Sequence, residues 1–174
     1  MEEAVDNRLE ELERRIAALE SAAGPRLRPD DGEVLPAGLD PEAFFALAAL
    51  KERVPPPGAV LYTGSVTLPN DRQIDWQYGR TTPEVLEADW SQRASALAAL
   101  GNPVRLTLLR EIVHGRTTVS ALSAVEGLGT SGQIYHHLRQ LTAEGWLHSP
   151  GRGSFAVPPT RVVALLAILV ALER

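Results

Sequence analysis

Residues 130–157 read TSGQIYHHLRQLTAEGWLHSPGRGSFAV, and this stretch decides the fold. Thr130, followed three residues later by Gln133, forms a capping box, which is a local signal for the start of a helix. At about 100° per residue, Ile134, Leu138 and Leu141 fall within a narrow arc and predict one buried side. Residues 146–157 carry a Pro-Gly-Arg-Gly turn at their centre, which indicates a β-hairpin. We therefore expect a helix over 130–144 and a hairpin directly after it.

Two further helices are predicted just before this stretch. Asn102 can cap a helix that has Pro103 at its first position and runs to Gly115. Thr117 or Thr118 starts a shorter helix, and residues 127–129 form a glycine-containing turn after it. A short helix, a turn, a second helix and a basic hairpin follow the order of winged helix-turn-helix domains, whose second helix enters the DNA major groove. The expected fold class is mainly α with small β.

The outward side of the 130–144 helix carries the candidate DNA contacts. Gln can pair bidentately with adenine and Arg with guanine, and both also reach phosphates. Arg152, at the hairpin turn, is expected to reach phosphate or the minor groove, whereas His137 borders the buried side and is interpreted as a packing residue. An ordinary solvated helix face and a solvated turn arginine are the alternatives. The candidate DNA-binding residues are Thr130, Ser131, Gly132, Gln133, Tyr135, His136, Arg139, Gln140 and Arg152.

Charge is distributed unevenly along the chain, whose net charge is −5. Residues 1–102 hold 10 basic and 18 acidic side chains, which gives −8. Residues 103–161 hold six arginines and three glutamates, which gives +3, and all four histidines lie there too. Because the location of charge matters more than its sum, the basic region remains a candidate for contact with nucleic acid.

Residues 1–20 show the heptad pattern of a coiled coil, because their apolar residues alternate spacings of four and three. With Leu9 and Ile16 at the a positions, a parallel dimer pairs Arg8 with Glu13 and Arg15 with Glu20. We therefore expect a dimeric coiled coil, and a single amphipathic helix lying on its own domain is the alternative. The seam consists of Val5, Leu9, Leu12, Ile16 and Leu19.

Residues 21–39 are rich in Pro, Gly, Asp and Ala and predict a linker. Residues 40–80 are expected to form a module of one helix and one β-hairpin, acting in dimerisation or sensing. One hairpin face carries Tyr62, Trp76 and Tyr78, which could line an apolar site for a small-molecule effector or could be core. Residues 81–174 then form the winged helix-turn-helix domain with a C-terminal dimerisation helix.

Two segments of this last region resemble the ArsR family of winged helix-turn-helix regulators. The first is LAALGNPVRL, residues 97–106, and the second is IYHHLRQL, residues 134–141, followed by Glu144, Gly145 and Trp146. The resemblance covers about residues 85–172. It implies a dimer in which the first and last helices, here about 83–100 and 160–172, form the subunit interface. The dimerisation residues expected there are Leu86, Trp90, Val162, Leu165, Leu166 and Leu169.

The sequence departs from the ArsR family in two respects. Metal sensors of that family use cysteines, or acidic and histidine residues on the last helix, whereas this chain has no cysteine and no histidine beyond His148. We therefore expect no metal and no other cofactor. The N-terminal 80 residues have no counterpart in the minimal family domain.

Together these features predict a sequence-specific transcriptional regulator that binds double-stranded DNA as a homodimer on an inverted repeat. Repression is the expectation that the family resemblance gives. Two alternatives remain: an architectural protein that bridges DNA, and a protein-interaction module that does not bind DNA.

Other classes of protein are disfavoured. A nucleophile elbow, a phosphate-binding loop and a paired-histidine metal motif are all missing from the sequence, so we do not expect an enzyme. The longest apolar run, residues 162–172, has 11 residues, well short of the ~20 that cross a bilayer. The charged N-terminus does not resemble a signal peptide. We expect a cytoplasmic, nucleoid-associated protein with no membrane partner.

Overall fold

The computed structural model describes residues 14–15 and 44–173. Residues 56–173 form one compact unit, and the described residues before them belong to another. The linker over 21–39 and all five seam residues of the predicted coiled coil, Val5, Leu9, Leu12, Ile16 and Leu19, lie outside the described residues. In the first unit, α2 (Phe45–Arg53) has no buried residue, and Phe45 is 69% exposed.

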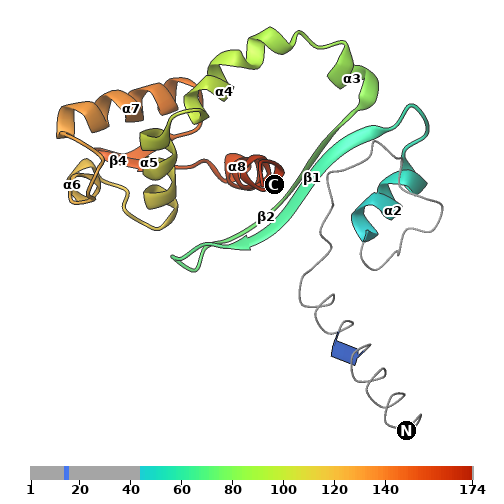
Figure 1. Cartoon of the computed structure of the whole chain (residues 1–174), viewed down its shortest axis with the longest axis horizontal. Helices are drawn as coiled ribbons and strands as arrows, with labels where there is room; N and C mark the ends of the chain where they lie inside the picture. The colour runs from blue at the N-terminus through green and yellow to red at the C-terminus, as the bar shows by residue number, and fades with distance from the viewer. Residues whose placement is uncertain (1–13, 16–43, 174) are drawn as a thin grey trace, which may run out of the picture. The chain divides into compact units, whose positions relative to one another are not determined.

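The described residues are mainly helical with a small amount of β-structure, as the sequence predicts (Figure 1). None of these helices is both long and apolar enough to cross a membrane. The elements of the second unit are β1 (Ala59–Thr67), β2 (Gln73–Thr81), α3 (Thr82–Leu86), η1 (Trp90–Arg93), α4 (Ala94–Leu100), α5 (Pro103–Val113), α6 (Val119–Ser123), α7 (Ser131–Ala143), β3 (His148–Gly151), β4 (Ser154–Ala156) and α8 (Pro159–Ala171).

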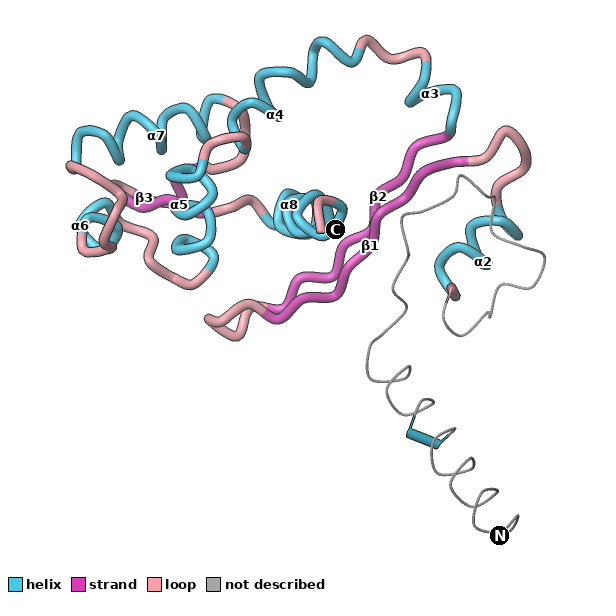
Figure 2. Tube along the Cα trace, viewed as in Figure 1, coloured by secondary structure: helices cyan, strands magenta, loops and turns pink. Residues whose placement is uncertain are grey.

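Strands β1 and β2 form the predicted antiparallel hairpin. Tyr62 lies opposite Tyr78, Gly64 opposite Trp76, and Val66 opposite Ile74, so the apolar residues share one face. Helix α8 packs against both strands, and Figure 2 shows it seated at the middle of the hairpin. Gly64 permits this close packing, because a Cβ at that position would lie 2.8 Å from Cγ1 of Val163.

The hairpin belongs to the same compact unit as residues 81–173, which differs from the predicted division at residue 80. Its apolar face buries Leu68 and Ile74 in one continuous core with Val162 and Val163 of α8. A two-stranded hairpin is marginally stable alone and needs such a partner. We predicted that the hairpin and the helix before it form one module. The contact of the hairpin with α8 joins segments about 100 residues apart, so local sequence patterns do not reveal it.

Helices α5, α6 and α7 pack around a second part of this core. Leu108, Leu122 and Leu138 are fully buried where these helices meet. The predicted caps are present: the Asn102 side chain accepts a hydrogen bond from the backbone N–H of Arg105 at 3.1 Å, and Thr118 accepts one from Ala121 at 3.2 Å. The hairpin of β3 and β4 is confirmed too, and Trp146 just before it is buried.

The single helix expected over about residues 83–100 is not continuous in the structure. The chain forms α3, η1 and α4 instead, because Asp89 interrupts the helix and its side chain accepts a hydrogen bond from the backbone N–H of Ser91 at 3.0 Å. Three apolar side chains of this segment are exposed within the chain: Leu86 and Trp90 are each 64% exposed, and Leu97 is 57% exposed. The apolar residues of this segment keep a helical spacing, although the backbone is not one continuous helix.

Substituting Gly64 tests the packing of α8 on the hairpin. We expect Gly64→Ala to lower the free energy of unfolding by about 1 to 3 kcal/mol, because the buried, branched Val163 cannot move aside easily. Urea denaturation measures this loss, which should shrink in a Val163→Ala background. Gly151→Ala is the matched control, since a Cβ there has open space around it. Equal stability of both glycine variants would contradict the packing described here.

Candidate functional site

Helix α7 begins at the capping box that the sequence predicts. The Gln133 side-chain oxygen accepts a hydrogen bond from the backbone N–H of Thr130 at 2.8 Å, and the Thr130 hydroxyl accepts one from that of Gln133 at 3.4 Å. The Ser131 hydroxyl lies 3.2 Å from that of Ser123 on α6. Thr130 and Gln133, predicted as DNA contacts, therefore use their side chains to hold the helix start.

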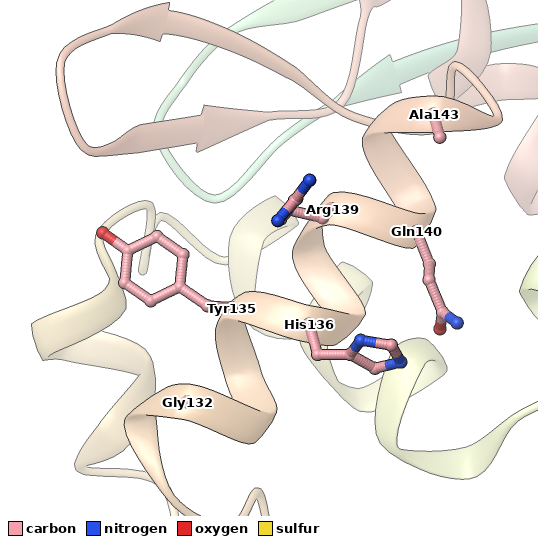
Figure 3. Close-up of a pocket in the computed structure, with 6 residues that line it drawn as sticks. All are labelled: Gly132, Tyr135, His136, Arg139, Gln140 and Ala143. Atoms are coloured by element: carbon pink, nitrogen blue, oxygen red, sulfur yellow. The ribbon is translucent and has the colours of Figure 1, made fainter.

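The two sides of α7 differ as predicted. Ile134, Leu138 and Leu141 are fully buried and face the core. On the opposite side, five of the nine residues predicted to contact DNA line an open hollow of about 540 Å³ together with Ala143, whereas Thr130, Ser131, Gln133 and Arg152 do not line it. Figure 3 shows Tyr135 and Arg139 projecting from one side of this outer surface, and His136 and Gln140 from the other. We call this surface, made of Gly132, Tyr135, His136, Arg139, Gln140 and Ala143, the α7 outer face.

Gln140 has a structural partner that the sequence does not reveal. Its side-chain oxygen accepts a hydrogen bond of 2.6 Å from Nη1 of Arg105, and Nη2 of the same guanidinium donates to the carbonyl of Ala98 at 2.7 Å. Bidentate pairing with adenine needs both the oxygen and the nitrogen of the amide. The bond from Arg105 occupies one of the two lone pairs of this oxygen and fixes the orientation of the Gln140 side chain.

His137 occupies the boundary between the two sides of α7, as expected for a packing residue. It is half-buried, and its Nδ1 has no hydrogen-bond partner in the described part of the chain. Burial, and then the positive charge of Arg105, lower the pKa of His137 below its ordinary value of 6.5. The imidazole is therefore neutral at pH 7 and adds no positive charge to α7.

Helix α4 is fastened to the carboxyl-terminal end of α7. The Ser95 hydroxyl donates to the carboxylate of Glu144 at 2.8 Å, and the Trp146 indole N–H donates to the carbonyl of Ala96 at 2.9 Å. The guanidinium of Arg161, on α8, lies 5.0 Å from the centre of the Trp146 ring, a distance typical of a cation–π contact. Together with Arg105, these contacts hold α4, α7 and α8 in a fixed relation.

Arg152 lies at the turn between β3 and β4 and is exposed. The turn is sharp because Gly153 adopts a φ of +73°, a conformation that glycine accepts readily. On the β4 side, the Phe155 backbone N–H donates to the carbonyl of Thr117, just before α6, at 2.8 Å. The hairpin that carries Arg152 is thus tied to the segment leading into α6.

The residues predicted for dimerisation fall into two groups. Leu86 and Trp90 are well exposed, and Leu169 is 39% exposed, so their side chains are available to a partner. Val162 and Leu165 are only 2% and 3% exposed, because they pack in the core of their own chain, and Leu166 is half-buried. The predictions for Val162 and Leu165 are therefore wrong.

Two of the three aromatic residues predicted to line a ligand site pack against the core, whereas Tyr78 is 44% exposed. Tyr62 and Trp76 are half-buried against it. The rings of Tyr62 and Tyr78 are 6.0 Å apart, and the guanidinium of Arg80 lies 5.9 Å from the Tyr78 ring. For Tyr62 and Trp76, this arrangement agrees with the alternative that they are core residues.

Sequence reasoning missed a charged cluster at the end of α5. The buried carboxylate of Glu111 accepts hydrogen bonds from Arg110 at 2.9 Å and from Arg116. The bond from Arg110, and then that from Arg116, lower the pKa of Glu111 below its ordinary value of 4.5, although burial opposes the shift. The sequence signal for this cluster was the spacing of the two arginines, which lie one residue before and five residues after Glu111.

Comparison with known proteins assigns no role to any of these residues. No protein-family model matches the chain, and no curated protein matches it either. The case for a function accordingly depends on the geometry and charge of the α7 outer face and its surroundings.

Replacing Glu111 should change how stability depends on pH. The lowered pKa means that this carboxylate stabilises the fold fully above pH 4.5, and that the stabilisation is lost as the pH falls towards the lowered value. We expect Glu111→Gln to be less stable than the parent at pH 7 and the gap to narrow below pH 4.5. Thermal denaturation from pH 3 to 7 measures the difference in stability between the parent and the variant, and Glu126→Gln, at an exposed position, is the control. A gap that is constant with pH would contradict the ionised pair.

Proposed function

We propose that this chain is a DNA-binding transcriptional regulator of the winged helix-turn-helix type, acting as a homodimer on an inverted repeat. The observation that carries the proposal is the α7 outer face, which stays open while the opposite side of the helix is fully buried. Helix α6 precedes α7 and the β3–β4 hairpin follows it, which is the element order of a winged helix-turn-helix domain.

Side chains on the α7 outer face suit the chemistry of the major groove. Arg139 is exposed and can donate two hydrogen bonds to guanine, while Tyr135 and His136 can contact bases or phosphates. Gly132 lies one turn earlier and lets a phosphate approach the backbone. Because Gln133 and Gln140 are engaged within the protein, Arg139 is the main candidate for reading sequence.

The local charge favours the same function. Residues 103–161 carry a net charge of +3 in a chain whose total is −5. Arg152 extends this positive charge to the hairpin turn, where a basic side chain can reach phosphate or the minor groove. The two segments that resemble the ArsR family coincide with the α4–α5 junction and with α7, which supports the same assignment.

A selection experiment tests the proposal directly. The full chain is mixed with a pool of randomised DNA duplexes, and the recovered sequences are identified and titrated again at two salt concentrations. Enrichment of one inverted repeat is the expected result. Salt-sensitive binding without enrichment would indicate an architectural protein, and no binding at either salt concentration would overturn the proposal.

Two arginine substitutions separate base contact from phosphate contact. We expect Arg139→Ala to weaken binding to the selected site by about 1 to 3 kcal/mol and to relax its sequence preference. Arg152→Ala should weaken binding to all duplexes more uniformly and reduce the salt dependence, because a phosphate contact carries no sequence information. Fluorescence anisotropy measures both, with Arg72→Ala in the β1–β2 turn as control. Negligible effects of both substitutions would exclude the α7 outer face.

Among the exposed apolar residues of the second unit, we assign those at two places to the contact with the second copy. They lie on the segment from α3 to α4 and on the last turn of α8, and large exposed apolar surfaces commonly mark interfaces. The residues are Leu86, Trp90, Leu97, Leu169, Val170 and Leu172. A homodimer through this surface joins α4 of each copy, and with it α7, to the partner.

Charging this surface should weaken the dimer. Burial of Leu97 or Val170 in a packed interface contributes about 1.5 to 3 kcal/mol each to the free energy of association, and this contribution is lost when the residue is replaced. We expect the Leu97→Asp/Val170→Asp variant to raise the dimer dissociation constant at least ~10-fold, as measured by sedimentation velocity of the full chain. Val60→Asp is the matched control, since Val60 is equally exposed on β1. An unchanged dissociation constant in the double variant would assign the dimer contact to other residues.

A further inference from the structure

Helices α5 and α8 enclose an apolar groove of about 310 Å³, within the size range of small-molecule sites. Leu109 and Leu165 are nearly fully buried and lie at its bottom. Leu106, Val113 and Leu166 are half-buried along it, and Leu169 is more exposed. The groove is separate from both the α7 outer face and the aromatic face of the hairpin.

The groove has a charged end. Arg110 and His114 line it together with the leucines, and the same two residues also line a neighbouring hollow of about 510 Å³ with Glu111 and Arg116. Two arginines face one carboxylate in that hollow, so one positive charge is in excess. Arg110 bonds to Glu111 through Nε and Nη2 and is still 66% exposed. Nδ1 of His114 lies 2.7 Å from the carbonyl of Arg110, so it donates to that oxygen and leaves Nε2 free of this bond.

An apolar groove that ends at a positive charge matches a ligand with an apolar body and an anionic head. The geometry points to a binding site for a small amphipathic carboxylate, with its hydrocarbon part between α5 and α8 and its carboxylate at Arg110. Carboxylates form strong charge-assisted hydrogen bonds with arginine. This site is independent of the proposed contact with DNA, because none of its residues belongs to the α7 outer face.

A second copy of the chain is the main competing occupant. Most of the exposed apolar residues assigned above to the dimer do not line the groove; only Leu169 is shared. An apolar segment of a second copy would also leave the positive charge of Arg110 without a counterpart. Charge complementarity therefore favours a carboxylate ligand over the partner chain.

Calorimetric titration of the full chain with octanoate tests the site. Acetate has the same head without the chain, and octylammonium has the same chain with the opposite charge. We expect octanoate to bind with one site per chain, acetate not to saturate, and octylammonium to bind at least about tenfold more weakly. No saturable binding of octanoate, or equal binding of octanoate and octylammonium, would overturn the proposal.

Variants locate the ligand within the groove. Arg110→Gln removes the cation and leaves Glu111 paired with Arg116, and we expect at least about fivefold weaker binding of octanoate. Val113→Phe fills the groove and should weaken binding similarly. Leu169→Trp does the same at an exposed position, which keeps the test decisive if Val113→Phe does not fold. Arg72→Gln is the matched control and should bind like the parent.

Two results of the variant series would refute the site. Unchanged affinity in Arg110→Gln and Leu169→Trp would show that octanoate binds elsewhere. Dissociation of the dimer by Leu169→Trp, together with no octanoate binding to the parent chain, would assign the groove to the second copy. Neither result depends on whether the protein binds DNA, so failure of this site is distinguishable from failure of the proposed function.

Discussion

The burial of Ile134, Leu138 and Leu141 is the constraint on which the rest of the second unit depends. Each fully buried aliphatic side chain contributes about 1.5 to 3 kcal/mol, so together these three fix the rotation of α7 about its axis. A turn of the helix by one residue, about 100°, would bring polar neighbours such as Arg139 towards the core and expose leucine. The polar character of the α7 outer face is therefore a consequence of core packing.

Arg105 connects this constraint to the surface proposed for the second copy. Its guanidinium bonds to Ala98 at the end of α4 and to Gln140 on α7, while Ser95 and Trp146 make two further bonds between the same regions. Three separate contacts restrain the distance and the angle between α4 and α7 more effectively than one would. A dimer formed through α4 would consequently set the separation of its two α7 helices, which a regulator reading an inverted repeat requires.

Local signals predicted the starts of helices and the hairpins well, because caps and turns are formed by residues close in sequence. Asn102 and Thr130 cap the helices that they were expected to cap, and Thr118, one of the two threonines considered, caps the short helix between them. The alternation of apolar residues predicted which of them share one face of the β1–β2 hairpin. The contacts of Gln140 and Glu144 could not be predicted in this way, since their partners are 35 and 49 residues away. The same holds for Gly64, whose role depends on a helix nearly 100 residues later.

Helix α8 shows that amino-acid composition alone does not distinguish residues buried in the chain's own core from residues available to a partner. It is apolar on all sides, so the sequence gives no means of choosing which leucines and valines face which neighbour. In the structure Val163 meets β1, Leu165 and Leu166 border α5, and Val170 is exposed. One short helix thus presents two apolar surfaces to different neighbours in its own chain and a third apolar surface that is exposed. A helix with apolar residues on all three of these surfaces has little room for polar residues, which accounts for the continuous apolar run of 162–172.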